Sequence, residues 1–114
     1  MVDALLKNDY AIVLTTESNK LKAELLAKNL LENKLAACIN FNEIVSLYLW
    51  QGKLTNASEV QLLIKTKNSE LKKLIEKIKE VHSYKVPEVI FWRISANQSY
   101  GDWINEVINS QDIS

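Results

Sequence analysis

The sequence predicts an α+β fold in which two helices cover one face of a four-stranded antiparallel sheet. Three observations lead to it: short apolar segments rich in β-branched residues, two stretches with apolar residues at helical spacing, and a long alternating stretch broken by a Gln-Gly pair. With 114 residues, 47% of them hydrophobic and 25% charged, the chain has the size and composition of one globular unit. We expect a single domain over residues 1–114.

The first strand and the first helix follow one another directly. Residues 10–15 are short, apolar and bounded by polar residues, which is typical of a buried strand. Ser18 then offers a side-chain cap for a helix that runs to about Asn33. The apolar stripe of that helix repeats at helical spacing and should pack on the sheet; it consists of Ala23, Leu26, Ala27 and Leu30.

A long antiparallel hairpin is predicted next. From residue 36 to residue 50 the side chains alternate between two faces, as they do in a strand. Gln51-Gly52 forms the turn, because glycine takes a positive φ at no steric cost. The return strand, over residues 59–66, places Val60, Leu62, Ile64 and Thr66 on one face.

The second half of the chain repeats the helix and strand pattern. Asn68 or Ser69 caps a helix whose apolar stripe ends near His82. Pro87 favours extended backbone before a strand over residues 89–94. A short helix over residues 102–109 closes the chain. The order β-α-β-β-α-β with a terminal helix predicts a ferredoxin-like sandwich.

The second face of this predicted sheet has no obvious cover. Tyr48 and Trp50, near the tip of the hairpin, would leave large aromatic surfaces in water, and such side chains are enriched in protein interfaces. Self-association would bury them. Alternatively, the terminal helix covers this face of the same subunit through Trp103.

Composition excludes several classes of function. Fourteen basic and fourteen acidic residues are interleaved, which disfavours nucleic acid as a partner. No apolar run has the length of a membrane span and residues 1–10 lack the core of a signal peptide, so we expect a cytoplasmic protein without membrane insertion. One cysteine, Cys38, cannot form a disulfide within the chain.

The candidate chemistry centres on His82, the only histidine. Neutral imidazole is a common metal ligand, but the sequence contains no Cys-x-x-Cys or His-x-x-x-His pair, so a tight site would need Glu88, Glu59, water or a second subunit. His82 beside Tyr84 or Glu88 would also suit proton transfer. The third interpretation is a histidine that only ends a helix, where its cationic form is favoured.

Other catalytic patterns are missing from the sequence. No motif marks a serine or cysteine nucleophile, and the two glycines lie too far apart to form a phosphate-binding loop. The sequence therefore contains no motif for covalent catalysis or phosphate binding, and we expect no required cofactor. Glu59 and Lys65 share a face of the return strand and, with Tyr48 and Trp50 across the hairpin, would line a polar and aromatic pocket or simply a solvated surface.

Five motifs in order resemble the CutA divalent-ion tolerance proteins, from about Tyr10 to Asn109. They are Leu35-Ala-Ala-Cys-Ile-Asn40, Ser46-Leu-Tyr-Leu-Trp-Gln-Gly-Lys53, Glu59-Val-Gln-Leu-Leu-Ile-Lys-Thr66, Val81-His-Ser-Tyr-Lys-Val-Pro-Glu88 and Tyr100-Gly-Asp-Trp103. The resemblance implies a ferredoxin-like subunit in a compact homotrimer whose hairpins meet between subunits. It also implies a cytoplasmic role in tolerance of copper or other divalent metals, without an established enzymatic activity.

The resemblance also directs attention to particular residues. Copper-binding members carry a cysteine where this chain has Thr15 and a second histidine where it has Val81, so His82 alone matches. We predict weak binding of Cu²⁺ or another divalent cation by His82 with oxygen ligands from Glu88 or Glu59. The expected pocket between subunits contains Tyr48, Trp50, Lys65, Tyr84 and Trp103.

Two other functions fit the same trimer. One is a PII-like sensor that binds a small anionic metabolite between subunits, with Lys65 and Lys85 as the cationic groups. The other is a structural trimer that serves only as an interaction partner.

Overall fold

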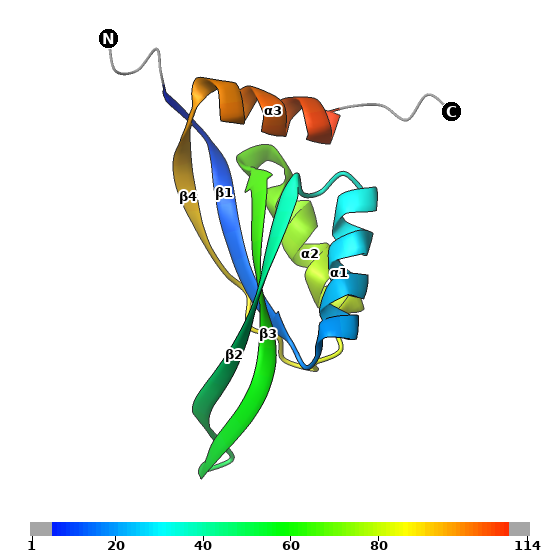
Figure 1. Ribbon diagram of the computed structural model, residues 1–114, viewed down its shortest axis with the longest axis vertical. Helices are drawn as coiled ribbons and strands as arrows, with labels where there is room; N and C mark the ends of the chain where they lie inside the picture. The colour runs from blue at the N-terminus through cyan, green and yellow to red at the C-terminus, as the bar shows by residue number, and fades with distance from the viewer. Residues whose placement is uncertain (1–5, 110–114) are drawn as a thin grey trace.

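The computed structural model describes residues 6–109 and confirms the predicted α+β class (Figure 1). Both ends of the predicted 1–114 domain lie outside these residues. The elements are β1 (Leu6–Glu17), α1 (Lys20–Glu32), β2 (Cys38–Trp50), β3 (Lys53–Lys67), a 3-10 turn (Asn68–Glu70), α2 (Leu71–Val81), β4 (Ile90–Asn97) and α3 (Gln98–Asn109). None of the described helices is both long and apolar enough to cross a membrane.

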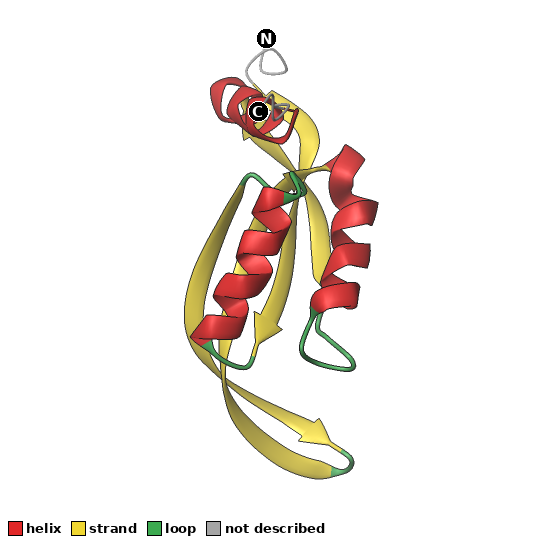
Figure 2. Ribbon diagram, turned by 90° about the vertical axis from the view of Figure 1, so that its right-hand side faces the viewer, coloured by secondary structure: helices red, strands yellow, loops and turns green. Residues whose placement is uncertain are grey.

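The sheet has the ferredoxin-like strand order β2-β3-β1-β4, with every neighbouring pair antiparallel. Helices α1 and α2 lie side by side on one face (Figure 2). Their buried side chains pack on alternate residues of β1 and β3, as the helical and strand periodicities predict. The core between the layers includes Val13, Ala23, Leu26, Leu30, Leu62, Ile64, Leu74 and Ile78.

Within the described residues, the opposite face of the sheet is covered at one end only. Helix α3 packs there on Tyr10, a fully buried side chain of β1, through Ile104 and Ile108. The tip of the β2–β3 hairpin lies at the far end of the molecule from α3 (Figure 1). Trp103 therefore does not cover Tyr48 and Trp50 within one subunit, and the hairpin aromatics remain 41% and 56% exposed.

The hairpin extends well beyond the layer of helices (Figures 1 and 2). Its turn has two residues, Gln51 and Gly52, with φ angles of 51° and 79°, so it is of the type I′ form that matches the twist of the strands. Thirteen consecutive cross-strand pairs follow, from Trp50–Lys53 to Cys38–Lys65. The predicted hairpin and its turn are confirmed.

The predicted helix caps and several element boundaries are wrong. Asn19, not Ser18, caps α1, because its side chain accepts a hydrogen bond of 2.9 Å from the backbone N–H of Lys22. Neither Asn68 nor Ser69 caps α2, since both lie within the preceding 3-10 turn. The predicted end of this helix near His82 is confirmed, since α2 ends at Val81 and His82 is its C-cap.

The strands and the last helix are also longer than predicted. Strand β1 continues to Glu17, and β4 continues to Asn97. Helix α3 begins at Gln98 and not at residue 102. The two strands are longer than predicted because polar residues at their ends keep the cross-strand hydrogen bonds, although these residues interrupt the apolar pattern.

Gly101 tests how α3 is held against the sheet. A Cβ atom at this position would lie 2.4 Å from the Tyr10 hydroxyl, so Gly101→Ala should lower the free energy of unfolding by about 1–3 kcal/mol. The direction of the change in stability is diagnostic, because replacing glycine with alanine in an unhindered helix stabilises the folded protein by about 1 kcal/mol. Urea denaturation measures the effect. Ser99→Ala, on the exposed side of α3, is the control, and a Gly101→Ala variant as stable as the parent would contradict this packing.

Candidate functional site

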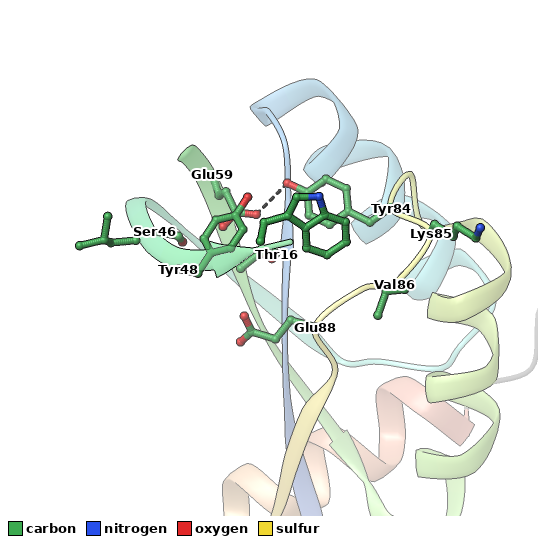
Figure 3. Close-up of a pocket in the computed structure, with 10 residues that line it drawn as sticks. Thr16, Ser46, Tyr48, Glu59, Tyr84, Lys85, Val86 and Glu88 are labelled. Carbon is green, nitrogen blue, oxygen red and sulfur yellow. Dashed lines mark hydrogen bonds between the residues drawn. The ribbon is translucent and has the colours of Figure 1, made fainter. Parts of the chain in front are cut away.

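A cavity of about 700 Å³ lies where the hairpin leaves the body of the protein (Figure 3). By strand alternation, Thr16 of β1, Glu59 of β3 and Tyr48 of β2 all belong to the sheet face that α1 and α2 leave uncovered. The loop between α2 and β4 closes the other side. The lining consists of Thr16, Ser46, Leu47, Tyr48, Trp50, Glu59, Tyr84, Lys85, Val86 and Glu88.

Tyr84 connects the loop to the hairpin. Its hydroxyl donates a hydrogen bond of 2.7 Å to Glu59 Oε2, as Figure 3 shows. Burial, this hydrogen bond and the negative charges of Glu59 and Glu17 together raise the pKa of Tyr84 well above its ordinary value of 10.0. Tyr84 is therefore a neutral donor at physiological pH.

A buried carboxylate holds the start of the loop. Glu17, at the end of β1, is only 2% exposed and accepts hydrogen bonds from the backbone N–H of Ser83 at 3.1 Å and from the Ser83 hydroxyl. The backbone N–H of Ser18 also donates to it, at 3.3 Å. A buried carboxylate needs such donors, because desolvating it without them is costly. The loop is thus fastened to the end of the central strand.

His82 completes this fastening. Its Nε2 lies 2.6 Å from the carbonyl oxygen of Thr16, and its Nδ1 accepts a hydrogen bond of 2.9 Å from the backbone N–H of Tyr84. A carbonyl oxygen can only accept, so Nε2 carries the proton and the pattern is that of the neutral ring. The side chain is fully buried, and Glu17 Oε2 lies 3.5 Å from Nδ1. Both ring nitrogens are therefore used by the protein itself.

A metal ion does not fit His82 in this geometry. A ligand nitrogen needs a free lone pair, whereas Nε2 is protonated and Nδ1 already accepts the Tyr84 N–H. Thr15, at the position of the cysteine ligand in copper-binding members, faces α1 and α2 from the sheet side opposite to the cavity. Within residues 6–109, no three side chains of His, Cys, Asp and Glu form a group that could hold a metal ion.

The residues predicted for the pocket fall in two places within one subunit. Tyr48, Trp50 and Tyr84 do come together at the cavity, with Glu59 and Glu88. Lys65 lies instead near α3, with Nζ 5.9 Å from the ring centroid of Tyr100. Trp103 is also on α3, where its ring lies 5.5 Å from that of Tyr100.

Sequence reasoning missed Glu17, Ser83 and Thr16. Thr16 contributes a backbone carbonyl, which no side-chain pattern can reveal. The role of Glu17 could have been predicted, because a carboxylate at the end of a buried strand requires hydrogen-bond donors from elsewhere in the fold. Ser83 supplies two of them.

The fold and site define a class: a small ferredoxin-like protein with an extended hairpin and an acidic, aromatic-lined cavity at its foot. The sequence profile of the CutA1 divalent ion tolerance protein family matches residues 11–107, and the chain belongs to this family.

Individual relatives agree with this assignment. The divalent-cation tolerance protein CutA of Thermus thermophilus is 39% identical over 97 residues, which are 83% of this chain and 94% of that protein. The corresponding protein of Pectobacterium atrosepticum is 39% identical over 99 residues, 85% of this chain and 90% of that protein. The structure of CutA from Synechococcus elongatus superimposes with a TM-score of 0.88 at 32% identity, over 91% of this chain and 96% of that one.

Tyr84→Phe tests the hydrogen bond to Glu59 through its pH dependence. Because the folded protein raises the pKa of Tyr84, the contribution of this group to the free energy of unfolding is fully present below pH 10. This contribution is lost as the pH rises above 10. The parent should exceed Tyr84→Phe by about 1 kcal/mol in free energy of unfolding at pH 8, and the gap should narrow above pH 10. Urea denaturation from pH 8 to 11 measures it, with Tyr100→Phe as the control. A gap that stays constant over this range would contradict the assignment.

Proposed function

We propose that the protein is a homotrimeric, non-enzymatic divalent-cation tolerance protein that binds a divalent cation weakly at the cavity beside the hairpin. The observation that carries the proposal is the pair of carboxylates, Glu59 and Glu88, on the lining of a cavity that one subunit leaves open. Figure 3 shows their positions relative to Tyr84 and Tyr48. The family to which the chain belongs is defined by divalent-ion tolerance.

The ligand set supports weak and not tight binding. Two carboxylates, one of which already accepts a hydrogen bond from Tyr84, supply too few ligands for a closed site. Water or a neighbouring subunit would supply the remainder. Among first-row divalent ions Cu²⁺ should bind most strongly, because it heads the order of affinities for oxygen and nitrogen ligands.

The surface of the hairpin supports self-association. Val45, Leu47 and Leu49 of β2 and Leu54 of β3 are 69%, 65%, 73% and 72% exposed, and strand alternation places all four on one face. On the sheet face opposite α1 and α2, Ile90 and Trp92 of β4 are also half exposed. Large exposed apolar side chains on both faces of the sheet are typical of an interface between subunits. A trimer would bury them and would bring neighbouring chains to the cavity.

A sensor of anionic metabolites has less support. Lys65, one of its two predicted cationic groups, lies near α3, away from the cavity. Lys85 is the only basic residue on the cavity lining, and it is accompanied by Glu59 and Glu88. An anion would therefore meet an excess of negative charge.

Calorimetric titration with Cu²⁺ tests the metal proposal. Glu59→Gln and Glu88→Gln should each weaken binding by about five-fold or more, because each removes one charged ligand. Glu43→Gln is the matched control, since Glu43 lies on β2 but not on the cavity lining. Equal affinity of all three variants would contradict a site at the cavity. A His82→Ala variant that folds but has lost the heat of binding would instead favour direct ligation by His82.

Light scattering tests the assembly. The parent should have about three times the subunit mass of 13.1 kDa, and Leu47→Glu should lower it, because a charge buried in the interface is costly. Leu21→Glu is the control: Leu21 has a nearly identical exposure of 67% but lies on α1, outside the hairpin. A parent mass of one subunit would overturn the trimer.

A further inference from the structure

The walls of the cavity are more aromatic than a metal site requires. Trp50 and Tyr48 approach from β2, and Tyr84 approaches from the loop between α2 and β4. Figure 3 shows the rings of Tyr48 and Tyr84 on either side of Glu59, within the same cavity. Val86 adds aliphatic surface. Such walls cannot coordinate a metal, so they point to a ligand with carbon atoms.

The charge of the cavity is negative. Glu59 and Glu88 outnumber Lys85 on its lining, and the buried Glu17 lies behind the loop. Within residues 6–109, the ion-pair partner of Glu17 is His82, whose hydrogen bonds are those of the neutral ring, and the donors from Ser83 and Ser18 carry no charge. The raised pKa of Tyr84, caused in part by Glu59 and Glu17, reports the same negative potential.

We propose that this cavity binds a small organic cation, an ammonium group with alkyl substituents, between the aromatic faces of Trp50, Tyr48 and Tyr84 and the carboxylates of Glu59 and Glu88. The inference concerns the site of the proposed function and rests on that site remaining open to solvent in the assembled protein. It names the ligand class for which the walls are suited.

Three physical reasons favour an alkylated ammonium ion over a bare metal ion. Aromatic faces attract a cation through the ring quadrupole, and this attraction is useful only when the cation sheds its water easily. Alkylated ammonium ions are weakly hydrated and bury carbon against Val86, whereas divalent metals retain their water. A volume of about 700 Å³ lies within the usual range for small-molecule pockets and far exceeds the space that one ion occupies.

Tetramethylammonium chloride is the probe, and tert-butanol is its uncharged near-isostere. Saturation-transfer NMR on the methyl signal of each compound detects weak binding to the intact protein, in phosphate buffer without competing amines. The parent should bind tetramethylammonium saturably and at least about three-fold more tightly than tert-butanol. Glu59→Gln should weaken binding about five-fold, and Trp50→Leu, which keeps the apolar surface, about two- to five-fold. Glu43→Gln should match the parent.

The outcomes separate this inference from the proposed function. Equal binding of the two probes, or no loss in Glu59→Gln and Trp50→Leu variants of native circular dichroism, would overturn the organic-cation site. Cu²⁺ is titrated in parallel: if Cu²⁺ binds and tetramethylammonium does not, only the further inference fails. If tetramethylammonium binds and Cu²⁺ does not, the metal proposal fails and the organic-cation site stands.

Discussion

The fastening of the loop between α2 and β4 to the end of β1 determines the geometry of the whole site. Glu17 accepts the donors of Ser83, and the carbonyl oxygen of Thr16 accepts the His82 Nε2–H. Because β1 is a central strand of the sheet, the loop is held to a rigid part of the fold. Tyr84 can then reach Glu59, and β3 brings the long hairpin to the same place.

This fastening depends on the residue type at position 83. Proline would stiffen the backbone, but it has no N–H to donate. Serine leaves the backbone freer and supplies both an N–H and a hydroxyl to Glu17. The carboxylate of Glu17 therefore holds this part of the loop through hydrogen bonds that a proline could not make in full. Two further hydrogen bonds, with the carbonyl oxygen of Thr16 and the backbone N–H of Tyr84, occupy both ring nitrogens of His82 in this subunit.

The fold was largely predictable from the sequence, whereas the site was predictable only in part. Helical spacing in α1 and α2 and alternation in β3 reflect burial on one side, which is a local property of the chain. Tyr48 and Trp50 were found because large exposed rings are unusual, and Tyr84 was found because it lies beside His82 in a motif of the family. The role of Glu17 and the separation of Lys65 from the cavity depend on how distant segments meet, and spacing along the chain does not encode that.

The two-residue turn of the hairpin limits how this protein can vary. Gln51 and Gly52 fix the pairing of every residue along the projecting strands. The hairpin can therefore become longer or shorter at its tip only if both strands gain or lose paired residues together. An insertion or deletion of one residue in a single strand would exchange its two faces, sending Tyr48 and Trp50 to the side of Leu47 and Leu49. This single insertion or deletion would remove both the aromatic wall of the cavity and the apolar face of the projecting hairpin. Ligand recognition and subunit contact therefore both depend on which side chains of β2 point to each face of the strand.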